Sequence, residues 1–247
     1  MRLQPFFCYY GGKWRAARRY PRPDYPTLIE PFAGGAGYAL TYPECSVILY
    51  EVDPIVYGVW EYLTKVTPAE VLALPLEVEH VDELQVSEPA KWLIGFWLNK
   101  GSSTPKKSPS VWARGGSRPN SYWGEVVRAR IAAQVRRIRH WKVHNRSYEA
   151  AGSLEATWFI DPPYAGEPGA HYRYRLTDYE ALARWCQERP GQVIVCEQEG
   201  ADWLPFRPFG VLAATRGEDR DGESSEVMWT NREPEAVDVL SLAFSDD

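Results

Sequence analysis

The residues Asp161-Pro162-Pro163-Tyr164 could do chemistry on an amino group. They follow the apolar run 157–160, which is typical of a buried central strand that ends at this loop. The two prolines have a fixed φ and no amide hydrogen, so the loop can neither extend the sheet nor fold back into a helix. We therefore expect a carboxylate, backbone carbonyls and an aromatic ring at the carboxyl end of the sheet, where open α/β sheets bind ligands. A flat base could be gripped there by its exocyclic nitrogen.

A second candidate site is the glycine-rich segment 31–37, which follows the apolar run 27–30. This pattern predicts a first strand, a tight turn and the start of a helix. Glycines let the backbone approach a ligand closely. Glu51 ends the next predicted strand, about twenty residues further on, where a carboxylate can bind the two hydroxyls of a ribose. The alternative is a generic turn packed against its helix, with Glu51 capping the helix at Pro54.

A cation is available near the amino terminus, in the sequence Tyr9-Tyr10-Gly11-Gly12-Lys13. Lys13 could meet a carboxylate or a phosphate. No Gly-Lys-Ser/Thr follows the glycine-rich turn, which disfavours a P-loop phosphate site. The combination favours a nucleoside ligand over the generic turn.

Charge is distributed unevenly. The chain of 247 residues has a net charge of -5, yet residues 100–146 hold twelve basic residues and a single acid, Glu125. Such segregation is typical of polyanion binding. The arginines of the predicted helix 123–139 either contact phosphates or form its solvated face, and the first reading is favoured because acids are missing from that face. The candidate DNA-contacting residues are Lys100, Lys106, Lys107, Arg114, Arg118, Arg128 and Arg136.

Composition argues against several classes of protein. No stretch approaches the roughly eighteen apolar residues that a membrane-spanning helix needs. The first twenty residues are basic and aromatic and lack the apolar core of a signal peptide. The four cysteines and four histidines are scattered without metal-ligand spacing. We expect a cytoplasmic protein with free thiols, no metal and no membrane partner.

Strands and helices alternate along the chain, which predicts an α/β fold with a mostly parallel sheet covered on both faces. Residues 68–98 read as short helices with acidic loops, and 101–122 as a mobile loop rich in Ser, Gly, Pro and basic residues. The expected strands are 27–30, 46–50, 141–144, 157–160 and 192–196, with 225–231 and 236–244 at the sheet edge, and the expected longer helices are 54–65, 123–139 and 178–188.

The motifs and their order resemble those of the Dam-type adenine-N6 DNA methyltransferases of the alpha arrangement. Those proteins carry an aromatic-x-Gly-Gly-Lys, a Glu-Pro-Phe-x-Gly-Gly, an acidic strand end and an Asp-Pro-Pro-Tyr. The matches here are 9–13, 30–37, 51–53 and 161–164, with 226–231 resembling a late strand of that family. The resemblance covers 5–65 and 142–231, and covers 66–141 only by position.

The resemblance implies a Rossmann-like S-adenosylmethionine-dependent methyltransferase domain over residues 1–66 and 142–247. A small, mainly helical target-recognition region is expected as an insertion at 67–141. The implied methyl donor is S-adenosylmethionine and the implied partner is double-stranded DNA. The implied setting is DNA methylation, including restriction–modification, in a prokaryotic or phage-infected cell, by a monomer or weak dimer.

The family's residue roles carry over onto the matched positions. Asp161 and the Pro162 carbonyl are expected to accept hydrogen bonds from the adenine amino group, while Tyr164 stacks on the ring. The target base must leave the duplex to reach them. The residues that the resemblance assigns to the donor are Tyr9, Lys13, Glu30, Phe32, Ala33, Gly34, Gly35, Glu51, Asp53, Ser147 and Asp161.

Ser147 stands where members of the family often carry an acid. The scaffold could also methylate cytosine N4, an RNA adenine or a protein amide, although aspartate at the first position of the loop favours adenine. A non-catalytic DNA-binding or donor-sensing relative is the third reading. Trp112, Tyr122 and Trp123 are candidates for DNA contact. Segment 172–175 either lines the site or is a solvent-facing connection.

Overall fold

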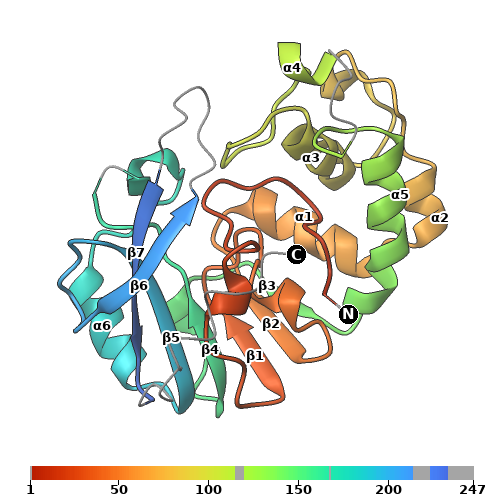
Figure 1. Cartoon of the computed structure of the whole chain (residues 1–247). Coiled ribbons are helices and arrows are strands. Elements are labelled where there is room, and N and C mark those ends of the chain that lie inside the picture. Colours follow the sequence, from red (N-terminus) through yellow and green to blue (C-terminus); the bar gives the residue numbers. More distant parts are fainter. Residues whose placement is uncertain (1, 115–119, 167, 214–222, 233–247) are drawn as a thin grey trace, which may run out of the picture.

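A seven-stranded sheet forms the centre of the computed structural model (Figure 1), which describes residues 2–114, 120–166, 168–213 and 223–232. The strand order is β3-β2-β1-β4-β5-β7-β6. The first five strands in this order pair in parallel, whereas β7 is antiparallel to β5 and β6. The strands are β1 (Thr27–Glu30), β2 (Ser46–Tyr50), β3 (Lys142–His144), β4 (Ala156–Ile160), β5 (Gly191–Gln198), β6 (Arg207–Ala213) and β7 (Glu223–Thr230). The predicted mixed α/β fold with a mostly parallel sheet is therefore confirmed, and it is compatible with a Rossmann-like arrangement.

The helices begin at residues suited to helix starts. The Asp53 side chain accepts a hydrogen bond from the Ile55 amide at the start of α1, and Thr67 and Glu70 form a capping box at α2. The α-helices are α1 (Pro54–Lys65), α2 (Pro68–Leu72), α3 (Glu88–Trp97), α4 (Val111–Arg114), α5 (Glu125–Gln134) and α6 (Tyr179–Gln187). Short 3-10 turns are η1 (Ala17–Arg19), η2 (Ala39–Thr41), η3 (Val81–Glu83), η4 (Val135–Ile138), η5 (Tyr148–Ala150) and η6 (Pro168–His171).

Helices cover both faces of the sheet, because successive side chains of a strand point to opposite faces. In β4, Phe159 joins the core that contains α1, α3 and α5, whereas Trp158 and Ile160 join the core that contains α6. All five residues of β4 are buried, as expected for a central parallel strand. Figure 1 shows α6 on one side of the sheet and α1 with α5 on the other.

The strand order places a topological switch between the neighbours β1 and β4. From β1 the chain goes on to β2 on one side, and from β4 it goes on to β5 on the other. Loops that leave the carboxyl ends of two such strands diverge and open a crevice between them. The two loops here are 31–37 and 161–166, which are the two motif-bearing segments.

Several sequence expectations need correction. The turn after β1 leads into the short 3-10 turn η2 and not into an α-helix. Strand β6 was not predicted; it contains Pro208, and proline is tolerated on an edge strand. The expected strand 225–231 is β7, but it lies inside the sheet, with β6 outside it. The expected strand 236–244 lies outside the described residues.

The described residues of the inserted region form helices and connecting loops and contain no strand. Between 67 and 141 it contains α2, η3, α3, α4, α5 and η4. The predicted helix 123–139 is divided into α5 and η4, and α4 lies within the loop expected at 101–122, of which 115–119 are outside the described residues. In the described ranges, no helix combines the length and the apolar character that crossing a membrane requires.

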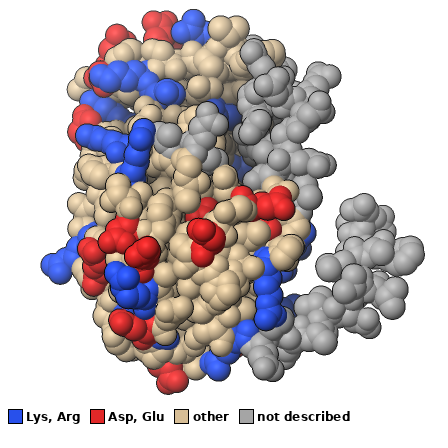
Figure 2. Space-filling model, turned by 90° about the vertical axis from the view of Figure 1, so that its left-hand side faces the viewer, with Lys and Arg blue, Asp and Glu red and all other residues tan. Residues whose placement is uncertain are grey.

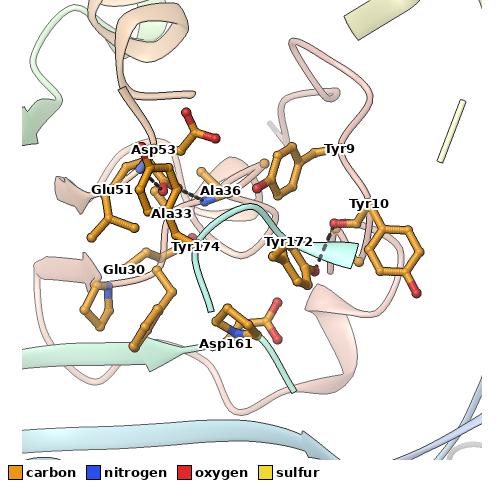
Figure 3. A pocket seen from close by; sticks show the side chains of 18 of the residues that line it. Tyr9, Tyr10, Glu30, Ala33, Ala36, Glu51, Asp53, Asp161, Tyr172 and Tyr174 are labelled. Atoms are coloured by element: carbon orange, nitrogen blue, oxygen red, sulfur yellow. Dashed lines mark hydrogen bonds between the residues drawn. The ribbon is translucent and has the colours of Figure 1, made fainter. Parts of the chain in front are cut away.

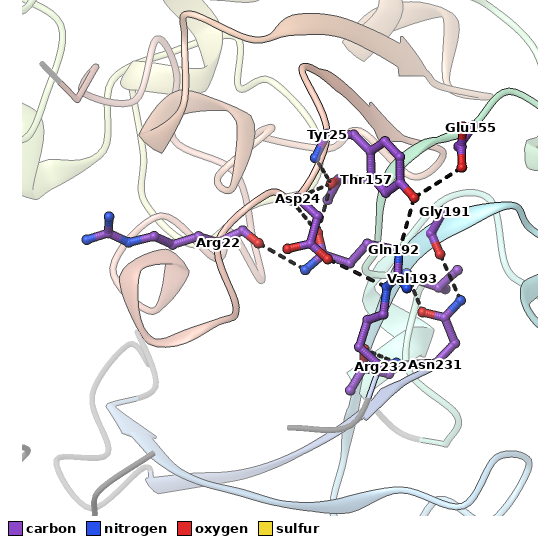
Figure 4. Close-up of polar contacts among 11 residues, drawn as sticks. Arg22, Asp24, Tyr25, Glu155, Thr157, Gly191, Gln192, Val193, Asn231 and Arg232 are labelled. Atoms are coloured by element: carbon purple, nitrogen blue, oxygen red, sulfur yellow. Dashed lines mark hydrogen bonds and ion pairs between the residues drawn. The ribbon is translucent and has the colours of Figure 1, made fainter. Parts of the chain in front are cut away.

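At the amino end of the sheet, a polar network ties the chain before β1 to β4, β5 and β7 (Figure 4). The Gln192 side chain accepts from the Asp24 amide (3.0 Å) and the Thr157 hydroxyl (2.8 Å), and donates to the Arg22 carbonyl (2.9 Å). Asn231 accepts from the Val193 amide and donates to the Gly191 carbonyl. These bonds fix the entry of β1 beside β4.

Candidate functional site

A pocket lies at the carboxyl end of the sheet, at the switch between β1 and β4 (Figure 3). In Figure 3, Asp161 lies at one end and Glu51 with Asp53 at the other. All eleven residues that the sequence assigned to the donor line it. Its lining consists of residues 9–13, 30–37, 51–53, 147–148 and 172–176, together with Phe159, Asp161 and Pro163.

The glycine-rich turn is shaped to receive a ring from the amino-terminal loop. Gly34 has a positive φ of 44°, and a Cβ atom there would come within 3.0 Å of the Tyr9 ring. A Cβ atom on Gly37 would lie 2.5 Å from the Trp14 amide nitrogen. Ala36 has a φ of 47°, a left-handed conformation that is uncommon outside glycine and is often found at functional sites. The turn therefore packs directly under the Tyr9 loop.

Glu51 is a buried acceptor at the end of β2. Its two oxygens accept from the backbone amides of Gly34 (3.0 Å) and Asp53 (2.9 Å). Burial raises the pKa of Glu51 to about 7, opposed by those hydrogen bonds. The cap of α1 is Asp53 and not Glu51, since the Ile55 amide donates to Asp53 at 2.8 Å. Glu51 therefore keeps its carboxylate on the pocket side of the helix start.

Glu30 anchors the chain beyond the glycine-rich turn. It is 2% exposed, and its carboxylate accepts from the Ala39 amide at 2.6 Å. Burial raises its pKa well above the ordinary range. Its bond to the first residue of η2 holds the far end of the turn, so Glu30 shapes this wall of the pocket.

Lys13 reaches across the pocket to the loop after β4. Its ammonium lies 2.9 Å from Asp161 Oδ1 and 3.7 Å from Glu226 Oε1, and it donates to the Gly11 carbonyl. Burial opposes the charge of Lys13, but the two carboxylates outweigh it and raise its pKa above the usual value. Burial raises the pKa of Asp161 to about 6, while Lys13 lowers it and Glu226 raises it. Lys13 is thus the counter-ion of Asp161.

The loop after β4 turns Asp161 and Pro163 toward the pocket, whereas Pro162 and Tyr164 are absent from its lining. The Tyr164 hydroxyl donates to Glu226 Oε2 at 2.7 Å, and its ring lies 4.6 Å from the Lys13 ammonium. The ring expected to stack on a base is therefore held against the ion cluster in this conformation.

Ser147 lines the pocket next to a stacked aromatic pair. Its hydroxyl caps η5 by accepting from the Glu149 amide, and it also donates to the Glu149 carboxylate. Tyr148 stacks on Phe32 with ring centroids 5.3 Å apart. At this part of the pocket, Ser147 supplies a hydroxyl and Tyr148 with Phe32 supplies an apolar wall.

Residues 172–176 line the pocket, and residues 173–175 within this segment are also exposed to solvent. The Tyr172 hydroxyl donates to the Tyr10 carbonyl at 3.3 Å. The inserted region meets the same place, because the Tyr10 amide donates to the Ser102 carbonyl and the Ser103 hydroxyl donates to the His171 carbonyl. Three distant parts of the chain therefore join at the rim.

The candidate DNA-contacting residues divide into two groups. Arg128 donates to the Leu74 carbonyl at 2.6 Å, and Lys107 pairs with Asp82 at 2.6 Å, so both serve the fold of the insertion. Arg118 lies outside the described residues. Five of the candidates are exposed, namely Lys100, Lys106, Lys107, Arg114 and Arg136.

The aromatic candidates also differ from one another. Trp112 on α4 is 70% exposed, while the Trp123 indole donates to the Pro75 carbonyl and packs into the core. On the face in Figure 2, Lys and Arg are prominent in the upper part, at the height of α3 and α4, and Asp and Glu cross the middle. Lys and Arg are also present in the lower part of this face, so its basic side chains are not confined to one region.

Sequence reasoning missed Glu226, Tyr20 and Glu197. Tyr20 donates to Glu226 at 3.2 Å, and Glu197 accepts from the Ala165 amide and the Trp203 indole. Burial raises the pKa of Glu197 to about 7. An acid inside an otherwise apolar strand was the available signal, because a buried carboxylate needs a partner.

No protein-family model matches the chain, and neither does any curated protein. Among solved structures, the chain is similar to a conserved hypothetical protein from Streptococcus pyogenes. The two share 11% sequence identity over 83% of this chain and 86% of that one, with a TM-score of 0.36. Likeness at this level carries no conclusion about function.

Proposed function

We propose that this protein transfers a methyl group from S-adenosylmethionine to the N6 amino group of an adenine flipped out of double-stranded DNA. The observation that carries the proposal is the meeting of two motif loops at one pocket: Asp161 paired with Lys13 at one end, and Glu51 beside the glycine-rich turn at the other. Asp161 can accept a hydrogen bond from an amino group, and Glu51 with the glycine-rich turn can bind a nucleoside.

The residues present fit such a donor. Glu51 is a buried carboxylate that can accept from ribose hydroxyls, and the Phe32–Tyr148 stack offers a flat apolar wall for an adenine ring. The donor supplies a methyl group bound to a positively charged sulfur, whose attraction to carboxylates favours an acidic pocket. Glu51, Asp53 and Asp161 provide that character.

Asp161 has two tasks in this function. An aromatic amino nitrogen is a poor nucleophile, because its lone pair is delocalised into the ring. A carboxylate that accepts a hydrogen bond from one N–H of the amino group orients the nitrogen and favours a pyramidal geometry. The same carboxylate can take the proton that the nitrogen must lose, since a raised pKa brings it closer to that task. For Tyr164 to stack on the base, its ring must leave the position that it occupies beside Lys13.

Labelled methyl transfer tests the proposal directly. The protein is incubated with labelled donor and with duplex DNA, single-stranded RNA or a protein mixture, and the modified nucleoside is identified by mass. We expect N6-methyladenine in duplex DNA. N4-methylcytosine or label in RNA alone would move the activity to another amino group on the same scaffold. Donor binding without transfer to any acceptor would favour a non-catalytic relative.

DNA contact can be tested with two arginines of the insertion. Arg114 is exposed, whereas Arg128 is engaged by the Leu74 carbonyl. Arg114→Ala should weaken DNA binding and its salt dependence without changing the unfolding temperature. Arg128→Ala should lower the unfolding temperature. Equal DNA affinity of the native protein and the Arg114 variant would place the duplex elsewhere.

A further inference from the structure

Glu226 is a buried carboxylate in contact with the same lysine as Asp161. It is 6% exposed, and its Oε1 atom lies 3.7 Å from the Lys13 ammonium. Its Oε2 atom accepts from the hydroxyls of Tyr164 (2.7 Å) and Tyr20 (3.2 Å). One side chain therefore touches both the counter-ion of Asp161 and the tyrosine of the Asp161 loop.

The backbone around Glu226 is built to aim this side chain inward. Glu226 lies in β7 opposite Gln198 of β5, and the pairing of β6 shifts register between Pro208 and Gly210 beside it. Such irregularities redirect side chains locally. Gly210 has a φ of 128°, and a Cβ atom there would collide with the Arg19 guanidinium.

Tyr20 packs against β6 at the position of this register shift. Its ring stacks on Phe209 of β6 with centroids 4.2 Å apart and an interplanar angle of 8°. The stack brings the Tyr20 hydroxyl to the Glu226 carboxylate. Residues from the amino-terminal segment, β6 and β7 thus converge on one carboxylate that the proposed reaction does not otherwise use.

The cluster has more negative than positive charge. Lys13 supplies one positive charge against the carboxylates of Asp161 and Glu226. The negative charge of Glu226 offsets part of the stabilisation that the Lys13 ammonium gives to the ionised form of Asp161. Glu226 therefore makes Asp161 a stronger base. The other groups that act electrostatically with Asp161 are Tyr164, Tyr20, Tyr172, Cys196, Glu30 and Glu197.

We propose that Glu226 is a positioning residue for Asp161: it shares the charge of Lys13, and thereby keeps Asp161 basic enough to take the proton that the target amino nitrogen loses. This inference rests on the proposed function. In that step an N–H bond of the amino group breaks, its electron pair stays on the nitrogen, and an O–H bond forms on Asp161. Asp161 changes from an anion to a neutral acid and later releases the proton to water.

Glu226→Gln removes the charge and keeps the size of the side chain. With Glu226 neutral, Lys13 acts on Asp161 alone, so the pKa of Asp161 should fall by about one unit. Carbon NMR of protein labelled at the aspartate carboxyl follows that titration directly. The acid limb of the methylation rate should move to lower pH together with the pKa, and the maximum rate should fall about tenfold because Asp161 is a weaker base. The dissociation constant of S-adenosylmethionine should change less than about twofold.

Tyr20→Phe is the matched control, because it removes a hydrogen bond to Glu226 and leaves the charge in place. The pKa of Asp161 and the acid limb should then stay where they are in the native protein. Glu226→Asn removes the same charge with a shorter side chain. It is the variant to measure if Glu226→Gln does not fold.

An Asp161 titration that is the same in native protein and in the neutral Glu226 variant would overturn the inference. So would equal shifts in the neutral Glu226 variant and in Tyr20→Phe, since they would point to packing and not to charge. The NMR titration needs no activity. If the native protein methylated no acceptor, the proposed function would fail, while the charge coupling of Glu226 to Asp161 would still be measured.

Discussion

The two ends of the sheet bury polar side chains in opposite ways, although β4 and β5 contribute to both. At the amino end, Thr157 and Gln192 are neutral, and their donors and acceptors meet one another and the backbone (Figure 4). At the carboxyl end, the partly buried Asp161 and the buried Glu197 are carboxyl groups with raised pKa values. The first arrangement joins strands at little desolvation cost, whereas the second keeps charge away from water.

The difference shows where the molecule gives up stability. A buried charge is costly unless it is paired and hydrogen-bonded, and a fold that only needed to hold together would use neutral groups at both ends. The carboxyl end instead concentrates acids around Lys13 and the glycine-rich turn. We infer that the amino end maintains the fold and that the carboxyl end is arranged for chemistry.

The largest effect should come from Asp161→Asn. Methyl transfer to DNA should fall by at least about a thousandfold, because the neutral amide can neither hold the amino group as strongly nor take its proton. The unfolding free energy should change less than in the amino-end variant described next, because Lys13 keeps Glu226 as its counter-ion. Single-turnover rates and thermal unfolding measure both. If the Asp161→Asn variant kept activity within tenfold of the native protein, the carboxyl end of the sheet would not be the site of chemistry.

Gln192→Ala should have the opposite profile. It removes the acceptor for the Asp24 amide and the Thr157 hydroxyl and the donor for the Arg22 carbonyl, so the protein should lose about 2–4 kcal/mol of stability. The methylation rate of the protein that remains folded should be close to native. Denaturant unfolding provides the first number. A Gln192 variant that is stable but inactive would show that the amino end also serves the site.

Stability should rise as pH falls from 8 to 5. The pKa values of Asp161, Glu51 and Glu197 are raised to about 6, 7 and 7, above the values of these groups in an unfolded chain. The folded protein therefore binds more protons than the unfolded chain in this window, and this stabilisation is lost as pH rises through 6–7. Since one pKa unit corresponds to roughly 1.4 kcal/mol, the gain at pH 5 relative to pH 8 should be on the order of several kcal/mol.

Glu197→Gln supplies the comparison for that measurement. The glutamine does not titrate, so the difference between the unfolding free energies at pH 5 and pH 8 should shrink. Denaturant titrations at the two pH values report it. If the stability of the native protein instead fell steadily from pH 8 to pH 5, ionising these carboxyl groups would not be costly in the folded protein.

The smallest effect should come from Tyr25→Phe at the rim of the amino-end network. Its hydroxyl donates to Glu155 and accepts from Arg232, both in contact with solvent. Exposed bonds of this kind contribute little, so we expect a change below about 0.5 kcal/mol. Thermal unfolding checks it. A loss as large as that of Gln192→Ala would place the strength of the network at its surface and not in its buried pair.

Local patterns predicted much of the fold. The bounds of β1, β2 and α1 follow from short apolar runs and from Pro54, whose position at the start of a helix is typical. Strand β6 and the order of β7 were not predictable, because they depend on pairing across the sheet and not on local preference.

For the candidate site, too, local motifs could be identified from the sequence, whereas contacts between distant segments could not. Motif spacing brought Lys13, Glu51 and Asp161 to one pocket, as the sequence predicted. It did not reveal that Lys13 pairs with Asp161 or that Glu226 completes the cluster, because those contacts depend on where β7 enters the sheet. Nor did it separate Arg128, which binds a carbonyl, from the exposed Arg114.

The entry of β7 between β5 and β6 has a consequence for biosynthesis. Tyr20 and Glu226 are 206 positions apart in the sequence, so a nascent chain that has emerged only as far as β5 contains the motif loops without their closing acid. Such a chain would have Asp161 held by Lys13 alone, and the outer edge of β5 would be unpaired and open to association with other chains. The order of translation would thus delay full reactivity until the last described strand is in place.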